Sequence, residues 1–443
     1  MADSLFQPLQ FRQFKVKNRI FRSNISGRFD NYDGSGNQAR INWELKFARN
    51  GVGGIMSSFV PVTIRGRIMP NYATIDRDER IPFWRELGKR VHEYDCRYIL
   101  QLSHGGRQRD FPGIEYAKGL SSTDKSDPVH GFPCERMTVA DIRDTVQAFA
   151  NGARRAREAG LDGVELHGAN GYLITQFLSS AINDREDEYG GPLENRARFL
   201  LEVVAGIRKE VGREFHLLVK ISGTDYNNAL APLEPPGNTV DESVQVATWL
   251  EAAGVDALHV STGSSFPHPK NPAGEFPVEE ALKTFPSMIP SGANELLNYL
   301  ALRTEPAALL YQALWNKARG DKIEGISAED SRKITSAVNI PVICTGGFQT
   351  ASVIRRAIES GACDAVSIAR PLVANNDLVT MFASGLDQAP KPCTYCNKCL
   401  VNVLQNPLGC YEESRFASRD EMLRQIFSVF VPAPFAEATA AHK

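Results

Sequence analysis

The repeating unit of the fold is clearest in residues 138–166, which read TVADIRDTVQAFANGARRAREAGLDGVEL. Thr138 stands where a helix N-cap belongs, and Gly160 follows the last turn of a helical pattern over residues 139–159. The short apolar run 163–166 comes almost at once and is typical of a buried strand. A helix that leads directly into a buried strand indicates an α/β protein.

The same unit recurs along the chain. Strands are predicted at residues 19–23, 54–58, 98–102, 163–166, 217–222, 257–261, 341–345 and 365–369. Helices are predicted at residues 38–50, 82–94, 139–159, 193–211, 240–253, 328–337, 351–360 and 377–383. Eight mostly continuous apolar strands alternating with helices predict a (β/α)8 TIM barrel. A doubly wound sheet is the alternative, and it is disfavoured because no GxGxxG motif follows the first strand.

Two segments fall outside the bare barrel. The first is a long insertion after the sixth strand, residues 263–326, whose core 294–318 is strongly helical. A packed pair of structural helices is favoured there over a moving lid, and a substrate wall or an oligomer contact are further alternatives. The second is a Cys-containing C-terminal extension, residues 391–443, with a helix at 419–430 and a Pro/Ala-rich end that we expect to fray. We therefore predict a barrel region 1–390, which includes the insertion, followed by this extension.

Composition narrows the classes of partner. The chain has 443 residues, 42% hydrophobic and 23% charged, with a net charge of −2. These values are typical of a globular protein and disfavour nucleic acid or an acidic membrane surface as a partner. No apolar run reaches transmembrane length, and the first residues do not resemble a signal peptide. We expect a cytoplasmic protein.

The end of the 163–166 strand carries the polar groups with the clearest chemistry. His167 and Asn170 can both donate hydrogen bonds to one carbonyl or nitro oxygen and so stabilise an enolate-like transition state. Tyr172 can deliver a proton nearby as a general acid. A lone triplet of this kind is more simply a strand cap, a turn and a packed ring, so the flanking sequence decides between the two interpretations.

That flanking sequence closely resembles the active-site signature of the Old Yellow Enzyme family of FMN-dependent ene-reductases. The resemblance is carried by residues 165–199, above all by Asp187-Glu-Tyr-Gly-Gly-Pro-Leu-Glu-Asn-Arg196, and it extends over roughly residues 5–412. It implies that NAD(P)H reduces bound FMN in a ping-pong cycle. An activated alkene, such as an enone or a nitroalkene, then places its oxygen on His167 and Asn170, takes hydride from flavin N5 and receives a proton from Tyr172.

Two strand residues are expected to contact the flavin ring. Lys220 is a cation inside an apolar strand, which is costly unless it meets an anion. The resemblance implies that the partner of Lys220 is the electron-rich edge of the flavin. A buried carboxylate is the less favoured partner. Gln101 offers the donor and the acceptor that a flavin pyrimidine edge requires. His104 and Arg107 follow shortly after Gln101. Each is as compatible with anchoring the loop as with a role in the site.

Three further loops complete the expected FMN site. The resemblance places Asn24, Ile25 and Ser26 against the flavin ring, although relatives often carry Pro-Met-Thr or Pro-Met-Cys there. Gly346 and Gly347 allow backbone N–H groups to approach a phosphate closely, next to Ala369 and the charged Arg370. Loops after strands seven and eight bind phosphate in barrels of this kind.

Four cysteines form the spacing C-x2-C-x2-C-x10-C: Cys393, Cys396, Cys399 and Cys410. The spacing suits a [4Fe–4S] cluster, zinc less well, and a metal-free loop is the alternative. The stretch is similar to the cluster site of the 2,4-dienoyl-CoA reductase and trimethylamine dehydrogenase branch, whose last gap is usually one or two residues longer. That branch also carries a further FAD/NAD(P)-binding region, which we do not expect within these residues.

The sequence thus leaves rival functions open beside the ene-reductase. One is an iron–sulfur flavoprotein dehydrogenase or demethylase that exchanges electrons with a separate partner protein, and another is a flavin-binding scaffold without catalysis. The physiological alkene, the choice between NADH and NADPH, and homo-oligomer formation are not determined by the sequence.

Overall fold

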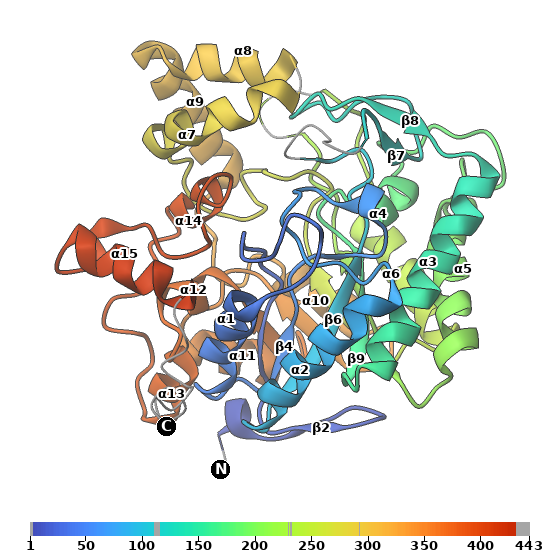
Figure 1. Ribbon diagram of the computed structural model, residues 1–443, viewed down its shortest axis with the longest axis horizontal. Coiled ribbons are helices and arrows are strands. Elements are labelled where there is room, and N and C mark those ends of the chain that lie inside the picture. The colour runs from blue at the N-terminus through green and yellow to red at the C-terminus, as the bar shows by residue number, and fades with distance from the viewer. Residues whose placement is uncertain (1–2, 110–115, 229, 231–232, 292, 431–443) are drawn as a thin grey trace.

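A closed barrel of eight parallel strands forms the centre of the computed structural model, which describes residues 3–109, 116–228, 230, 233–291 and 293–430 (Figure 1). The barrel strands are β3 Ile20–Arg22, β4 Gly54–Met56, β6 Arg97–Ser103, β9 Gly163–Gly168, β10 His216–Ser222, β11 Ala257–Ser261, β12 Val342–Thr345 and β13 Ala365–Ile368. β13 pairs with β3, and β4 pairs with β6, so the sheet closes on itself. The (β/α)8 barrel is confirmed, with a strand in each predicted range.

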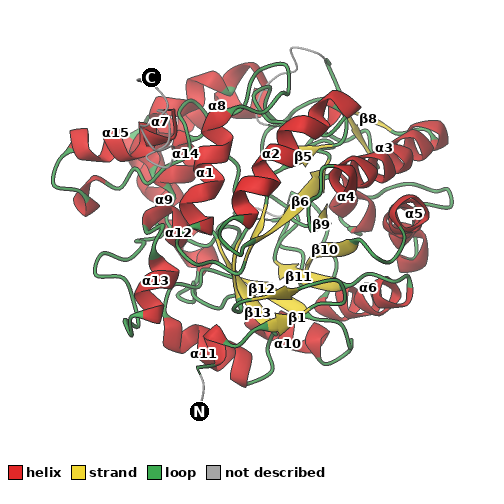
Figure 2. Cartoon of the chain, turned by 60° about the horizontal axis from the view of Figure 1, so that its bottom comes forward, coloured by secondary structure: helices red, strands yellow, loops and turns green. Residues whose placement is uncertain are grey.

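Helices surround this barrel (Figure 2). They are α1 Gln38–Ala48, α2 Ile81–His92, α3 Val139–Glu158, α4 Leu173–Leu178, α5 Leu193–Val211, α6 Val240–Ala252, α10 Ala328–Thr335, α11 Ala351–Glu359, α12 Arg370–Ala374 and α13 Leu378–Ala383. α3 begins with a capping box in which Asp141 N–H donates to Thr138 Oγ1 (3.1 Å) and Thr138 N–H donates to Asp141 Oδ2 (2.8 Å). The predicted N-cap is therefore correct.

A short N-terminal hairpin closes one end of the barrel. Its strands β1 Leu9–Gln10 and β2 Lys15–Val16 are antiparallel. Phe11, between them, packs edge-on to Phe21 of β3, with ring centroids 6.1 Å apart. The hairpin and the inward residues of the strands share one apolar cluster: Leu9, Phe11, Phe14, Val16, Phe21, Met56, Ile99, Leu218, Ala257, Ile343 and Ala365. Access to the barrel is therefore from the opposite end, where the strands terminate.

The insertion and the C-terminal extension lie together beside that open end. The insertion contains α7 Val278–Thr284, α8 Ala293–Leu302 and α9 Glu305–Arg319, so its helical core is a pair of helices. The extension contains α14 Lys398–Asn402 and α15 Arg419–Phe427, and Figure 1 shows α14 directly next to α7. The predicted helix 419–430 ends in a short 3-10 turn, and the end expected to fray lies outside the described residues.

The remaining strands are short and were not predicted. β5 Val60–Pro61 pairs with β6, while β7 Gly119–Ser121 and β8 Cys134–Arg136 pair with each other. Among the described residues, the helices are all too short or too polar to cross a bilayer.

Candidate active site

One cavity of about 340 Å³ opens at the carboxyl ends of the barrel strands. All twelve residues predicted to be catalytic or to bind the flavin line it: Asn24, Ile25, Ser26, Gln101, His167, Asn170, Tyr172, Lys220, Gly346, Gly347, Ala369 and Arg370. They come from six of the eight barrel strands or the loops that follow them. The parallel barrel therefore gathers residues that are almost 350 positions apart in the sequence.

His167 and Tyr172 face each other in this cavity. Their rings are 4.7 Å apart and inclined by 65°, and the Phe59 ring lies 4.8 Å from Tyr172. Burial holds the pKa of His167 well below its ordinary value, and the nearby Lys220 and His259 lower it further. Burial thus favours the neutral imidazole, and the buried Nδ1 of His167 has no hydrogen-bond partner among the residues that the structure describes.

Asn170 occupies a strained backbone position next to this pair. Its φ is +60°, in the left-handed region that asparagine tolerates better than most residues, and Gly171 follows with φ +85°. The Asn170 amide donates to Asn271 Oδ1 (2.9 Å) and to the Thr262 carbonyl (3.3 Å). The predicted oxygen donor is therefore engaged with the insertion, and a substrate oxygen would have to replace one of these acceptors.

A buried polar layer beneath these residues was not predicted. Glu165 Oε1 accepts hydrogen bonds from Gln101 Nε2 and from Asn24 Nδ2, both at 2.8 Å. Glu165 Oε2 lies 2.7 Å from His259 Nδ1, and His259 Nε2 lies 2.7 Å from Ser367 Oγ. These side chains come from strands that are not all neighbours, so they meet across the interior of the barrel. The signal was available, since Glu165 and His259 both interrupt apolar strands as Lys220 does.

Lys220 completes this layer. Its ammonium donates to Asn24 Oδ1 at 3.2 Å. Burial lowers the pKa of Lys220 to about 8, and the charge of Glu165 partly opposes that effect. Burial alone would raise the pKa of Glu165, but His259, Lys220 and Asn24 hold it below its ordinary value. The layer therefore combines a buried anion and a buried cation, with the cation nearer the cavity.

The chemistry of the lining fits a flavin. Gln101, which lines the cavity, uses its amide nitrogen on Glu165, while its buried Oε1 has no hydrogen-bond partner among the described residues. Lys220 presents a cation, and Ser26 fixes the loop by accepting a hydrogen bond from Phe59 N–H at 3.1 Å. An unsatisfied buried acceptor is costly, so a ligand N–H opposite Gln101 would stabilise the site.

The expected phosphate loops meet next to this region. At Gly347, φ is +71° and a Cβ would lie 2.8 Å from the Ile323 carbonyl oxygen, so glycine is required there. The Arg370 guanidinium donates to Asn397 Oδ1 and to the Ala273 carbonyl (2.7 Å). It thus holds the cysteine loop against the insertion while also lining the cavity. Its predicted contact with a phosphate remains a prediction.

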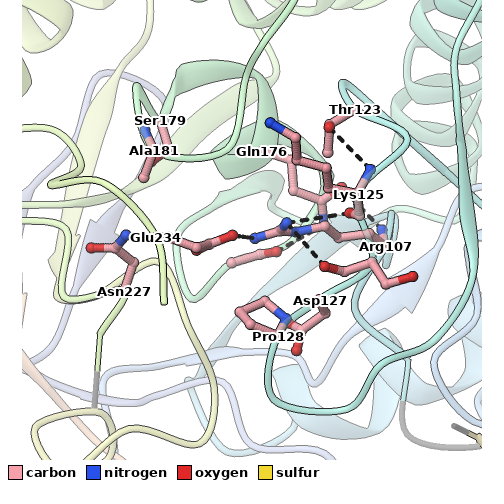
Figure 3. A network of polar contacts seen from close by, with 12 residues as sticks. Arg107, Thr123, Lys125, Asp127, Pro128, Gln176, Ser179, Ala181, Asn227 and Glu234 are labelled. Atoms are coloured by element: carbon pink, nitrogen blue, oxygen red, sulfur yellow. Dashed lines mark hydrogen bonds and ion pairs between the residues drawn. The ribbon is translucent and has the colours of Figure 1, made fainter. Parts of the chain in front are cut away.

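His104 and Arg107 serve as loop anchors. His104 Nδ1 accepts the Gly106 N–H (3.1 Å), and burial lowers the pKa of this imidazole to about 3. The Arg107 guanidinium lies 2.5 Å from Glu234 and also reaches the Lys125 carbonyl (3.4 Å), as Figure 3 shows. Of the two interpretations, the structure supports anchoring, because three loops converge on Arg107 and neither residue lines the cavity.

The four clustered cysteines line a second, small cavity beside Arg370 and Arg415. Burial raises the pKa of Cys393 and of Cys410. Across the described part of the chain, no three His, Cys, Asp or Glu side chains converge tightly enough for a single metal ion. A [4Fe–4S] cluster would take one of these thiolates at each iron, and metal binding by the four cysteines remains a prediction.

Comparison with known proteins places this geometry in context. The model of the NADH:flavin oxidoreductase / NADH oxidase family matches residues 4–284. An NADPH dehydrogenase of Geobacillus sp. (strain WCH70) is 40% identical over 270 residues, which are 60% of this chain and 75% of that protein. An NADH oxidase of Thermoanaerobacter brockii is 30% identical over 94% of this chain, but the match spans only 58% of that longer protein.

A solved structure agrees with the barrel. The Old Yellow Enzyme homologue from Zymomonas mobilis superimposes with a TM-score of 0.65 at 22% identity, covering 88% of this chain and 99% of that one. At this identity the likeness establishes the fold alone.

Proposed function

Because the chain belongs to the NADH:flavin oxidoreductase / NADH oxidase family, we propose that it is an FMN-dependent enzyme that uses NAD(P)H to reduce an activated C=C bond. The resemblance to Old Yellow Enzymes is confirmed. The observation that carries the proposal is the cavity itself, in which His167, Asn170 and Tyr172 lie with Gln101 and Lys220. An enone or a nitroalkene has the oxygen and the electron-poor carbon that this set requires.

Each polar group has a distinct task in this proposal. The neutral His167 donates a hydrogen bond to the substrate oxygen, and the Asn170 amide turns from Asn271 to the same oxygen. Both donors are fixed in a buried site, where they stabilise developing negative charge strongly. The Tyr172 hydroxyl, whose ring packs against His167, gives its proton to the carbon next to the activating group.

The cofactor would be held by the remaining lining residues. Gln101 and Lys220 would contact the ring, Asn24, Ile25 and Ser26 its face and edge, and Gly346, Gly347, Ala369 and Arg370 the phosphate. FMN bound there would supply the hydride that an alkene accepts.

The proposal is tested with the FMN-loaded protein under anaerobic conditions. NADH or NADPH should bleach the flavin absorbance, and 2-cyclohexenone should restore it. His167→Ala should weaken the binding of a phenol, since it removes a donor to the ligand oxygen. A protein that binds FMN but reduces neither 2-cyclohexenone nor a nitroalkene would favour the scaffold function instead.

A second function is supported by the cysteine cavity. Cys393, Cys396, Cys399 and Cys410 surround one space and would hold a [4Fe–4S] cluster, which supplies one-electron transfer. We propose this site for an enzyme that exchanges electrons with a separate protein. Iron and sulfide assays on anaerobically purified protein should find about four of each per chain. Flavin without iron or sulfide would leave the cysteines as a metal-free loop.

The state of the cysteines bears on the compartment. All eight cysteines are free, which is compatible with the reducing cytoplasm that we propose as its location.

A further inference from the structure

The cavity does not end at the catalytic groups. It continues beneath the insertion into a space between the insertion helices and α14, which we call the apolar lobe. Its lining residues are Phe276, Pro277, Ala281, Phe285, Met288, Glu295, Asn298, Ala301, Leu302, Tyr311, Trp315, Leu400, Val401, Val403 and Leu404. Apart from Glu295 and Asn298 these residues are apolar or aromatic, whereas the catalytic polar groups lie at the barrel end of the same cavity.

Aromatic packing defines one wall of the apolar lobe. The Phe276 ring lies 4.8 Å from Tyr311 and 5.1 Å from Trp315. Trp315 is 2% exposed, and its indole N–H donates to the Gly274 carbonyl at 2.9 Å. Because one ring is fixed by a hydrogen bond and the others pack against it, this wall is rigid rather than a loose gap.

The opposite wall is also held in place. Asn402, at the end of α14, donates to Glu280 of α7 (3.2 Å), and Gln405 donates to the Thr284 carbonyl (3.2 Å). Ala281 of α7 is fully buried between these contacts and lines the apolar lobe. The small side chain at this position leaves room that a larger residue would fill.

We propose that the apolar lobe binds an uncharged, elongated apolar substituent of the alkene substrate, and that Ala281 and Val401 limit its length. The inference rests on the proposed reaction at His167 and Tyr172. The lobe is continuous with the catalytic cavity, so a substrate held by its oxygen can extend a chain into it. The exposed leucines of the insertion, such as Leu297 and Leu310, lie outside this lining and have no part in the proposal.

A homologous series of linear 3-alken-2-ones tests the length dependence with the FMN-loaded protein. Each added methylene that enters the apolar lobe should raise kcat/KM by about fourfold, mainly through KM, until the lobe is full. A value of kcat/KM that does not change with chain length, while 2-cyclohexenone is reduced normally, would overturn the inference and leave the proposed reaction intact.

Two variants locate the effect. Ala281→Phe and Val401→Phe should each abolish most of the gain for long chains and leave 2-cyclohexenone reduction within about twofold of wild type. Ala313→Phe, an exposed position on α9 outside the lining, is the matched control and should behave as wild type. If the long-chain gain survives both lining variants in folded protein, the apolar lobe is not the binding site.

A binding measurement separates this inference from turnover. The dissociation constants of 4-alkylphenols, followed by tryptophan fluorescence, should fall with alkyl length in wild type and stay constant in Ala281→Phe. That outcome in a protein that reduces no alkene would support the apolar lobe while refuting the proposed reaction. Dissociation constants independent of alkyl length would refute the apolar lobe.

Discussion

Glu165 and His259 give the site its electrostatic character although neither was predicted to belong to it. Each lies between apolar neighbours in its strand, and each is fully buried. Their hydrogen bonds to Gln101, Asn24 and Ser367 fix the side chains on which a flavin would rest. A buried network of this kind is rigid when every member is satisfied, and Gln101 Oε1 is the acceptor left for a ligand.

Replacing Tyr172 by Phe removes a hydroxyl and keeps the ring that packs against His167 and Phe59. The oxidative half-reaction with an enone should slow by roughly 10²- to 10⁴-fold, because the proposed general acid is lost. Reduction of FMN by NAD(P)H should remain nearly unchanged. Stopped-flow absorbance measures both halves separately, and equal slowing of both would remove Tyr172 from the proposed role.

Replacing Lys220 by Met tests the buried charge in protein stripped of FMN. Burial lowers the pKa of Lys220 to about 8 from an ordinary 10.5. Below pH 8 the Lys220 amine is protonated in the folded and in the unfolded chain, and its buried charge destabilises the fold. The unfolded chain binds the extra proton between pH 8 and 10.5, so stability of the wild type rises over that window. The variant lacks this rise.

Urea titrations at pH 7.5 and at pH 10 measure the free energy of unfolding of the wild type and of Lys220→Met. The advantage of Lys220→Met over wild type should shrink between these two pH values by about 2 kcal/mol. Comparison within the pair cancels other titrating groups, such as Lys46. A difference that stays constant with pH would show that Lys220 is not buried as a charge.

At the scale of elements, the helix pair of the insertion is held beside the cavity by a buried tryptophan. Trp315 of α9 is buried, and its hydrogen bond to the Gly274 carbonyl joins the helix pair to the segment after β11. The same segment carries Asn271, which holds Asn170. Of the alternatives for the insertion, this packing favours a structural helix pair that also forms a substrate wall, rather than a moving lid.

Trp315→Ala should therefore loosen the insertion without unfolding the barrel. The loss is expected to be about 3–5 kcal/mol of local stability, because a large buried ring is removed. Limited proteolysis should cut within residues 293–319 much faster, whereas circular dichroism of the barrel should change little. Leu310→Ala, at an exposed site on the same helix, is the control and should alter stability by less than about 0.5 kcal/mol.

For the whole molecule, the C-terminal extension connects distant parts of the chain. Asn42 of α1 donates to the Val429 carbonyl at 2.8 Å, and Ile426 of α15 lies against Gly409, where a Cβ would clash at 2.5 Å. The loop before it is fixed to the barrel through Arg370 and Asn397. The extension thus contacts α1, near the start of the barrel, and α12, near its end. We propose that it unfolds together with the barrel.

Ile426→Ala tests this proposal. The substitution leaves a cavity between α15 and Gly409 and should cost about 2–5 kcal/mol in one cooperative transition. Thermal unfolding followed by both tryptophan fluorescence and circular dichroism should shift together. Gln425→Ala, an exposed neighbour, should leave the midpoint unchanged. Two separate transitions would show that the extension is an independent unit.

The sequence by itself determined the alternation of strands and helices and the residues at the strand ends. Apolar strand runs, and helix boundary signals such as Thr138 and Gly160, depend on local chemistry, so each barrel strand and its helix were predictable. His167, Asn170 and Tyr172 were predictable because they are close together in a distinctive stretch. The short helices α4, α7, α12 and α14 were not predicted, since tertiary packing stabilises them rather than propensity.

Only the tertiary structure decided which distant groups meet. Glu165, Gln101, His259 and Ser367 contact one another because the closed barrel directs alternate residues of separate strands inward. The apolar lobe likewise exists only where the insertion and the extension pack together. Local patterns encode the conformation of a segment, whereas a contact between strands that are far apart in the sequence depends on the closure of the whole barrel.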